Sequence, residues 1–188
     1  MLRKLVIVVG FLMVTLIGGY YVTVQGLSYE ISGYRAYHEQ LDEQHLRELN
    51  SRFENAYDAT EGELRRFALN NTAFELDFAM RKNGLKNPNS ILDGKKGHCK
   101  MYSYLMAASF NQLAKRNGIK ANCRIAIGHV FLYGVNLHQF SNSSFFANHD
   151  FCVITGKEGA QAADAILYDY FGVDHIRIRT PLLACGKP

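Results

Sequence analysis

The sequence lacks the patterns that mark several common protein classes. Its four cysteines include no C-x-x-C pair, and such short paired spacings are what structural zinc sites favour. Its basic residues cluster no further than pairs such as Arg65-Arg66 and Lys115-Arg116, and its net charge is only +4, which is far from a nucleic-acid footprint. No internal repeat and no low-complexity tract occurs. We therefore expect no nucleic-acid partner and no metal, and nothing in the chain indicates a cofactor.

Length and composition indicate one globular domain. A chain of 188 residues can build one hydrophobic core, whereas two full domains would be cramped. The hydrophobic fraction of 48% is ordinary for a globular protein. We divide the chain into an N-terminal membrane segment at residues 1–27, a helical region at residues 28–84, and a core at residues 85–188 that holds the candidate site residues.

A long uncharged run lies near the N-terminus. Leu5 to Val24 contains twenty residues without a charge, and a helix of that length spans about 30 Å, the thickness of the hydrocarbon core of a bilayer. Arg3 and Lys4 precede this run, and the next basic residue is Arg35. The positive-inside rule then predicts a single-pass membrane protein with a cytoplasmic N-terminus, and the rest of the chain is expected to be periplasmic or extracellular.

A cleaved signal peptide is the competing interpretation of this segment. Its n-region would be Met1 to Lys4, and its h-region would begin at Leu5. No clear small-x-small cleavage site follows, because Gly18-Gly19-Tyr20 is a poor one, so an uncleaved signal-anchor is preferred. Both interpretations export the remainder of the chain.

An exported domain raises the question of disulfide bonds. If Cys99 is a nucleophile, as argued below, then Cys123, Cys152 and Cys185 remain. Cys123 and Cys152 each lie in a strand-like run and could pair across neighbouring strands, which would leave Cys185 free. Free cysteines also behave as small buried hydrophobes, so both alternatives stay open.

The first half of the chain has helical character. Apolar residues recur at roughly helical spacing from Ser28 to Tyr57, which predicts one or two amphipathic helices. Thr60 and Glu63 form a capping box, and this predicts a helix from about Glu61 to Lys82. Turn-forming residues make Leu85 to Gly97 a predicted loop.

The second half combines one very apolar helix with strands. The segment from Cys99 to Arg116 is apolar over most of its circumference and is followed by Asn117-Gly118, so we expect a central helix packed on more than one side. Gly156 to Ala163 is a predicted hairpin loop. Four runs are typical of strands in an antiparallel sheet: Asn122–Tyr133, His149–Thr155, Ala165–Phe171 and Ile176–Arg179. This order of helices followed by strands predicts an α+β fold.

Three residues with reactive or ionisable side chains lie at the start or in the middle of these predicted elements. Cys99 opens the central helix, where unpaired backbone N–H groups and the helix dipole stabilise a thiolate. His149 begins one predicted strand, and Asp169 interrupts the apolar run of another, where a buried carboxylate needs a partner. A thiol, an imidazole and a carboxylate in this order predict a Cys99-His149-Asp169 catalytic triad.

These segments resemble the transglutaminase-like, papain-fold superfamily. The resembling residues are Gly-His-Cys-Lys-Met-Tyr-Ser at 97–103, Asn-Gly-Ile-Lys-Ala at 117–121, His-Asp-Phe at 149–151 and Leu-Tyr-Asp at 167–169. In that family the matching Cys, His and Asp form the triad, and a central helix packs against an antiparallel sheet. The resemblance covers about half the chain, from Leu85 to Arg179. The chain departs from the family pattern at Tyr170, where a proline often follows the Asp.

The resemblance implies a thiol protease or amidohydrolase that cleaves peptide or amide bonds of a protein or peptide substrate through a thioester. The same triad supports a protein-glutamine transglutaminase or a deamidase, since all three reactions pass through that intermediate. A non-catalytic binding or assembly domain on this fold is the alternative from another class. A metal site that combines Cys99, Cys123 and Cys152 with histidines is a third.

Other residues are candidates for a base, an oxyanion donor or a lid. His129 in the first strand is a rival base, although its partner carboxylate would be missing from the next strand. The backbone N–H of Cys99 is the natural oxyanion donor, and Asn87 or Asn89 could add a side-chain amide, although turn chemistry explains both. Gly134 to Asn148 is longer than a tight hairpin needs and is a candidate lid.

Overall fold

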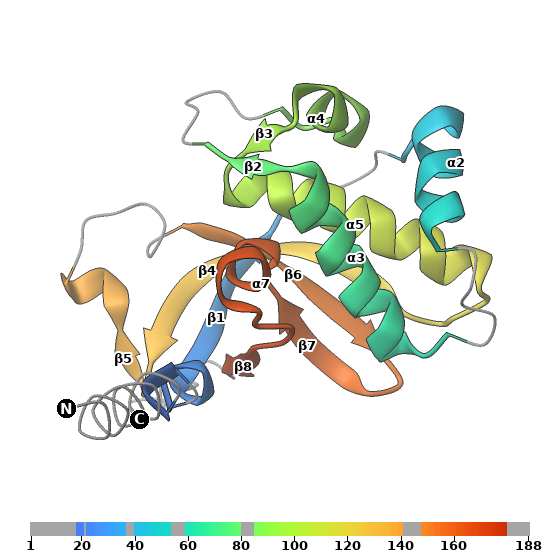
Figure 1. The fold of residues 1–188 in the computed structure, drawn as a ribbon. Helices are drawn as coiled ribbons and strands as arrows, with labels where there is room; N and C mark the ends of the chain where they lie inside the picture. The colour runs from blue at the N-terminus through green and yellow to red at the C-terminus, as the bar shows by residue number, and fades with distance from the viewer. Residues whose placement is uncertain are drawn as a thin grey trace, which may run out of the picture.

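The fold is α+β and is described from a computed structural model (Figure 1). It describes residues 18–20, 22–36, 40–53, 59–79, 85–140 and 148–179. The predicted membrane segment from Leu5 to Val24 lies mostly outside these residues, and so does Cys185. Among the residues that are described, no helix is both long enough and apolar enough to cross a bilayer.

A mixed sheet forms the centre of the molecule. Its strand order is β7-β6-β4-β1-β8, with β5 paired to β4. The strands are β1 (Leu27–Tyr34), β4 (Asn122–Leu132), β5 (Val135–Asn136), β6 (His149–Gly156), β7 (Gly159–Ala163) and β8 (Arg177–Arg179). Neighbouring strands are antiparallel, except that β8 runs parallel to β1, so the expected purely antiparallel sheet is wrong. A bridge between Ala162 and Ile176 brings the two sheet edges together, and the sheet is nearly a barrel.

Helices α2 (Glu43–Arg52), α3 (Glu61–Glu75), α4 (Pro88–Gly94), α5 (Cys99–Arg116) and α7 (Ala165–Phe171) gather on one side of this sheet (Figure 1). A 3-10 turn, η1 (Leu137–Phe140), directly follows β5. A two-stranded parallel pair, β2 (Asp77–Phe78) and β3 (Lys96–Gly97), lies just before α5. The bounds of α5 confirm the predicted central helix, and it is buried along most of its length.

Two hydrophobic cores lie on the opposite faces of the sheet. Alternate side chains of a strand point to opposite faces, so Cys152 and Ile154 of β6 pack toward α5, whereas Phe151 and Val153 pack inside the near-barrel. Tyr29 of β1 is fully buried in this second core. The strand β6 therefore connects the helix core to the barrel interior.

The predicted helices between Ser28 and Tyr57 are only partly correct. Helix α2 falls within this range, but Leu27–Tyr34 is the strand β1, paired on both sides within the sheet. Leu27, Tyr29 and Ile31 alternate with polar residues and all contact the barrel core, which is the period of a half-buried strand. The pairing energy of a central strand outweighs the helical spacing that the longer segment also contains.

The helix predicted from Glu61 to Lys82 ends earlier, at Glu75. Its capping box is confirmed, since Thr60 and Glu63 bond reciprocally. The chain then becomes extended at Leu76, whose carbonyl accepts a hydrogen bond of 2.5 Å from the hydroxyl of Tyr102. The predicted loop from Leu85 to Gly97 contains the short elements α4 and β3.

The strand predicted at Ala165–Phe171 is wrong, because this segment is the helix α7. Asp164 caps its N-terminus by accepting hydrogen bonds from backbone N–H groups, and Gly172 ends it with a φ of 65°. Seven mostly apolar residues fit a buried helix as well as a strand. The loop predicted at Gly156–Ala163 is instead a tight turn followed by the strand β7.

Gly128 allows β4 to pack closely against its neighbours beside His149, its register partner on β6. A Cβ atom at Gly128 would lie 2.0 Å from the backbone oxygen of Glu30 and 3.1 Å from the ring of Phe151. We expect Gly128→Ala to lower the free energy of unfolding by about 3 kcal/mol, because strand backbone must move. Urea denaturation measures this loss.

Gly33→Ala in β1 is the matched control, since a Cβ there meets no atom within 4 Å. Its effect on stability is expected to stay within about 0.5 kcal/mol. Equal stability losses for the two variants would contradict the close approach at Gly128.

Candidate active site

Cys99 is the first residue of α5, as the sequence predicted. The preceding residue, His98, is the N-cap and is extended, but its side chain makes no capping hydrogen bond. The first N–H groups of α5 are therefore not taken by a side-chain cap. The half-buried Cys99 places its Sγ 3.9 Å from Nδ1 of His98.

His149 begins β6 and is fully buried. Its ring meets that of Tyr29 edge-on, with centroids 5.6 Å apart, and stacks on Phe151 at 6.3 Å. The thiol of Cys99 lies near enough to add to the rise in the pKa of His149. The structure thus brings together the predicted nucleophile and the predicted base.

The carboxylate that meets this histidine is Asp164, which sequence reasoning missed. Oδ2 of Asp164 contacts Nε2 of His149 and accepts a hydrogen bond of 2.5 Å from the hydroxyl of Tyr29. Oδ1 accepts from the backbone N–H groups of Ile166 at 2.9 Å and Leu167 at 3.2 Å. The position of Asp164 between the end of β7 and the start of α7 holds both oxygens in place.

Asp169, the predicted third member, has a different partner. It lies on α7, is exposed, and accepts a hydrogen bond of 3.2 Å from the hydroxyl of Tyr102 on α5. Partial burial raises the pKa of Asp169, and Asp77 raises it further, although the bond from Tyr102 opposes this. The structure therefore places Asp164, rather than the predicted Asp169, against His149, and the contact between Asp169 and Tyr102 ties α7 to α5.

The His149–Asp164 pair is strongly polarised. Burial alone would lower the pKa of His149, but the charge of Asp164, their hydrogen bond and the contact with Cys99 raise it to about 10. Burial alone would raise the pKa of Asp164, but His149 and the bonds from Tyr29 and Leu167 lower it. A paired imidazolium and carboxylate are the favoured state of these buried groups.

A second ion pair flanks the site. Arg35, just after β1, binds both carboxylate oxygens of the buried Asp150, which follows His149. Burial lowers the pKa of the neighbouring His98, and Lys100 and Arg35 add to this, while Asp150 opposes it. His98 is thus held neutral beside Cys99, and the positive charge next to the thiol resides on His149.

The remaining candidate residues lie elsewhere or have structural partners. His129, the rival base, lies on β4 opposite Glu30. Asn87 caps α4, whereas Asn89 lies on α4 and exchanges hydrogen bonds with the backbone of residues 40 and 42, so both side-chain amides have structural partners. Only the first part of the candidate lid, β5 and η1, is described up to Phe140.

The cysteine alternatives can be compared for Cys123 and Cys152 only. Both are free thiols, buried on neighbouring strands β4 and β6 and displaced by two residues in register. Burial and the contact with Cys123 raise the pKa of Cys152 well above its ordinary value, which fits their role as small buried hydrophobes. Within the described ranges, no group of three or more His, Cys, Asp or Glu side chains is placed to hold a metal ion.

A local signal for Asp164 exists in the sequence. Asp164 interrupts the run Ala162-Ala163-Asp164-Ala165-Ile166, where an unpaired buried carboxylate would be costly. The cost of burying an unpaired carboxylate applies equally to Asp169. The sequence favours Asp169 because its pattern predicts a strand at residues 165–171, whereas the strand lies at residues 159–163 and ends just before Asp164. Tyr29 carried no signal of its own, since only the folded sheet brings β1 to the end of β7.

Comparisons of the chain with protein-family models, with curated proteins and with solved structures find no significant match.

Proposed function

We propose that the chain is a cysteine hydrolase of the transglutaminase-like, papain-fold type that cleaves peptide or amide bonds. The observation that supports this most directly is the buried pair of His149 and Asp164, with Cys99 near enough to raise the pKa of His149. A nucleophile, a base and an acceptor that fixes the base are the minimum for covalent acyl chemistry. In this proposal Asp164 takes the role that the sequence gave to Asp169.

The reaction begins with the thiolate of Cys99 paired to the imidazolium of His149. The sulfur attacks the substrate carbonyl carbon, and the C–O double bond becomes a C–O⁻ single bond. When the tetrahedral intermediate collapses, the C–N bond breaks and His149 gives its proton to the leaving amine, which leaves a thioester on Cys99. Neutral His149 takes a proton from water, which attacks the thioester; the C–S bond then breaks, releasing the acid and restoring the Cys99 thiolate beside the His149 imidazolium.

Two features support these steps. Asp164 is itself fixed by Tyr29 and by backbone N–H groups, so it holds His149 in one tautomer and stabilises the imidazolium. The uncapped start of α5 offers backbone N–H groups, including that of Cys99, to the developing oxyanion. Such donors strengthen as charge moves onto the carbonyl oxygen, so they act mainly on the transition state.

The acyl acceptor is a further part of the proposal. Water is always present, so hydrolysis is favoured over transglutamination, in which an amine needs its own site. Deamidation of a glutamine side chain uses the same steps with ammonia as the leaving group. We also propose that residues 5–24 anchor the chain in a membrane and that the hydrolase domain acts on exported protein or peptide substrates.

Selective labelling of Cys99 tests the proposed nucleophile. At mildly acidic pH, iodoacetamide should modify Cys99 at least about tenfold faster than any other cysteine, because Cys99 is only half-buried at the start of α5 beside the imidazolium of His149, while Cys123 and Cys152 are buried. Peptide mapping by mass spectrometry identifies the modified residue.

His149→Ala is the variant that separates ionisation from simple exposure. It should slow labelling of Cys99 while leaving the thiol as accessible as before. Equal labelling of all four cysteines in the folded protein, or unchanged labelling in His149→Ala, would contradict the proposed hydrolase.

A further inference from the structure

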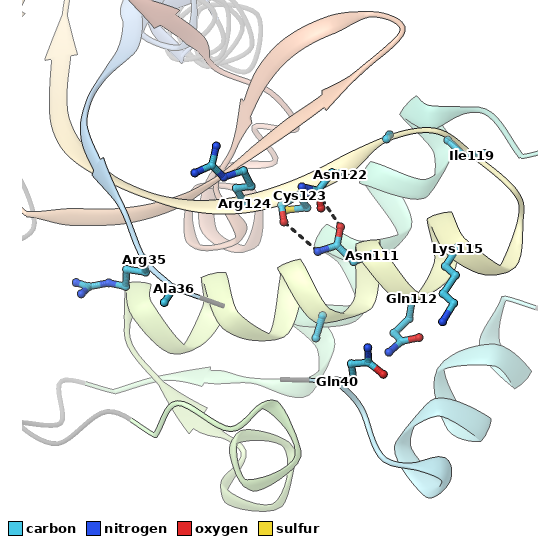
Figure 2. Close-up of a pocket in the computed structure, with 12 residues that line it drawn as sticks. Arg35, Ala36, Gln40, Asn111, Gln112, Lys115, Ile119, Asn122, Cys123 and Arg124 are labelled. Atoms are coloured by element: carbon cyan, nitrogen blue, oxygen red, sulfur yellow. Dashed lines mark hydrogen bonds between the residues drawn. The ribbon is translucent and has the colours of Figure 1, made fainter. Parts of the chain in front are cut away.

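A groove of about 660 Å³ lies between α5 and β4, at a distance from the thiol (Figure 2). Its helical wall is one stripe of α5 formed by Ala108, Asn111, Gln112 and Lys115, spaced as residues on a single helix face are. Its opposite wall comes from the first residues of β4, including Arg124. The groove follows α5 away from the catalytic end of the helix.

Among the described residues, the charged side chains that line this groove are all positive. They are Arg35, Lys115 and Arg124, and no described lining residue carries a carboxylate. Within the described part of the chain, neither Lys115 nor Arg124 forms an ion pair; Arg124 instead lies over the ring of Tyr34, 3.9 Å from its centroid. Arg35 is neutralised by Asp150, so Lys115 and Arg124 are the two lining cations without a described counter-charge, and they favour an anionic occupant.

The groove is also rigid and rich in hydrogen-bonding groups. Asn111 exchanges two hydrogen bonds with the backbone of Cys123, at 2.8 and 2.9 Å, and so locks α5 to β4 at the groove floor. Gln40 and Gln112 add amides that can donate to or accept from a polypeptide backbone. Figure 2 shows these amides on the same side of α5 as Lys115.

Arg35 connects the groove to the catalytic end of α5. It lines the groove and binds Asp150, next to His149, and this hydrogen bond raises the pKa of its guanidinium. Figure 2 shows Arg35 near one end of α5 and Lys115 near the other. The helix between residues 99 and 115 is about 24 Å long, which an extended peptide of about eight residues would span.

We propose that the groove between α5 and β4 holds an acidic stretch of the substrate polypeptide while another part of that chain lies at Cys99. This inference rests on the proposed hydrolase function and adds the substrate class to it. Lys115 and Arg124 bind carboxylates, and the amides bind the peptide backbone. Substrates without acidic residues at this distance from the scissile bond lack these contacts.

Peptide binding to the full-length Cys99→Ala variant tests the groove without any turnover. The probe is a fluorescein-labelled peptide of about eight residues that alternates glutamate and alanine, and its Kd is measured by fluorescence anisotropy. Lys115→Glu and Arg124→Glu should each raise the Kd about fivefold or more, and added salt should weaken binding to the parent protein.

Arg116→Glu is the matched control, because Arg116 is exposed on the same turn of α5 but does not line the groove. It changes the net charge equally and should alter the Kd by less than about twofold. The proposal is overturned if Arg116→Glu weakens binding as much as Lys115→Glu does, or if a glutamine–alanine peptide binds as tightly. Tighter binding of an oligonucleotide at the same residues would also overturn it.

The two proposals fail separately in these experiments. Binding to Cys99→Ala does not depend on a reactive thiol, so unselective labelling of the cysteines would remove the hydrolase while leaving the groove result intact. Conversely, a Kd that Lys115→Glu and Arg124→Glu leave unchanged would overturn the acidic-peptide site. The proposed reactivity of Cys99 would then stand without an assigned substrate preference.

Discussion

Asp164→Asn should lower the acylation rate of Cys99 by about 10³- to 10⁴-fold while the protein stays folded. An asparagine still accepts the capping hydrogen bonds of α7 through its oxygen, so the helix is retained. Its NH₂ group would then face His149 and Tyr29, which favours the wrong imidazole tautomer and removes the negative charge that stabilises the imidazolium. Burst release of p-nitrophenol from p-nitrophenyl acetate measures the acylation rate.

Asp169→Asn supplies the comparison, because it makes the same chemical change five residues further along α7. Asp169 accepts from Tyr102 and lies outside the pair formed by His149 and Asp164, so the acylation rate should change by no more than a few-fold. If Asp169→Asn abolished acylation and Asp164→Asn left it intact, the original Cys99-His149-Asp169 triad would be restored.

His149→Gln should lower the free energy of unfolding by about 3–5 kcal/mol near neutral pH, because Asp164 is left as a buried charge without its partner. The pKa of His149 rises from 6.5 to about 10 on folding. Its contribution to stability is therefore complete below pH 6.5 and is lost as the pH rises through about 10. The stability difference between the parent protein and His149→Gln should shrink over that range.

At acidic pH, the stability that the ion pair contributes is limited by protonation of Asp164. Folding lowers the pKa of Asp164 below 3.8, so the carboxylate contributes stability above that pH and loses it on acidification. Urea denaturation at several pH values measures the profile, with His129→Gln on the adjacent strand as a control for the loss of a strand histidine. A difference that grew between pH 6.5 and 10 would rule out the buried ion pair.

The sequence predicts the parts of this site that depend on local pattern. The helix at Cys99–Arg116 follows from its apolar periodicity and its Asn-Gly end, and the strand beginning at His149 follows from a continuous apolar run. These two elements place Cys99 near enough to His149 to raise its pKa. A boundary error of one or two residues would not have changed this result.

The parts that failed depend on pairings distant in sequence. Asp164 and Asp169 stand in similar apolar surroundings, and only the choice between strand and helix for residues 159–171 decides which one faces His149. Tyr29 reaches Asp164 because β1 enters the sheet between β4 and β8. Nothing in the spacing around Tyr29 specifies that neighbour, since the same residues also fit an amphipathic helix.

Asp164 both caps α7 and holds His149, and this determines how the protein would lose activity. One oxygen completes the first turn of α7 and the other holds the imidazole, so the carboxylate cannot stay aligned when that short helix frays. Helices of this length do not persist without tertiary contacts, and α7 relies on contacts such as that between Asp169 and Tyr102. Local unfolding of the seven residues of α7 would therefore inactivate Cys99 while the sheet and α5 stay folded. Activity would then be lost under milder conditions than those that unfold the whole protein.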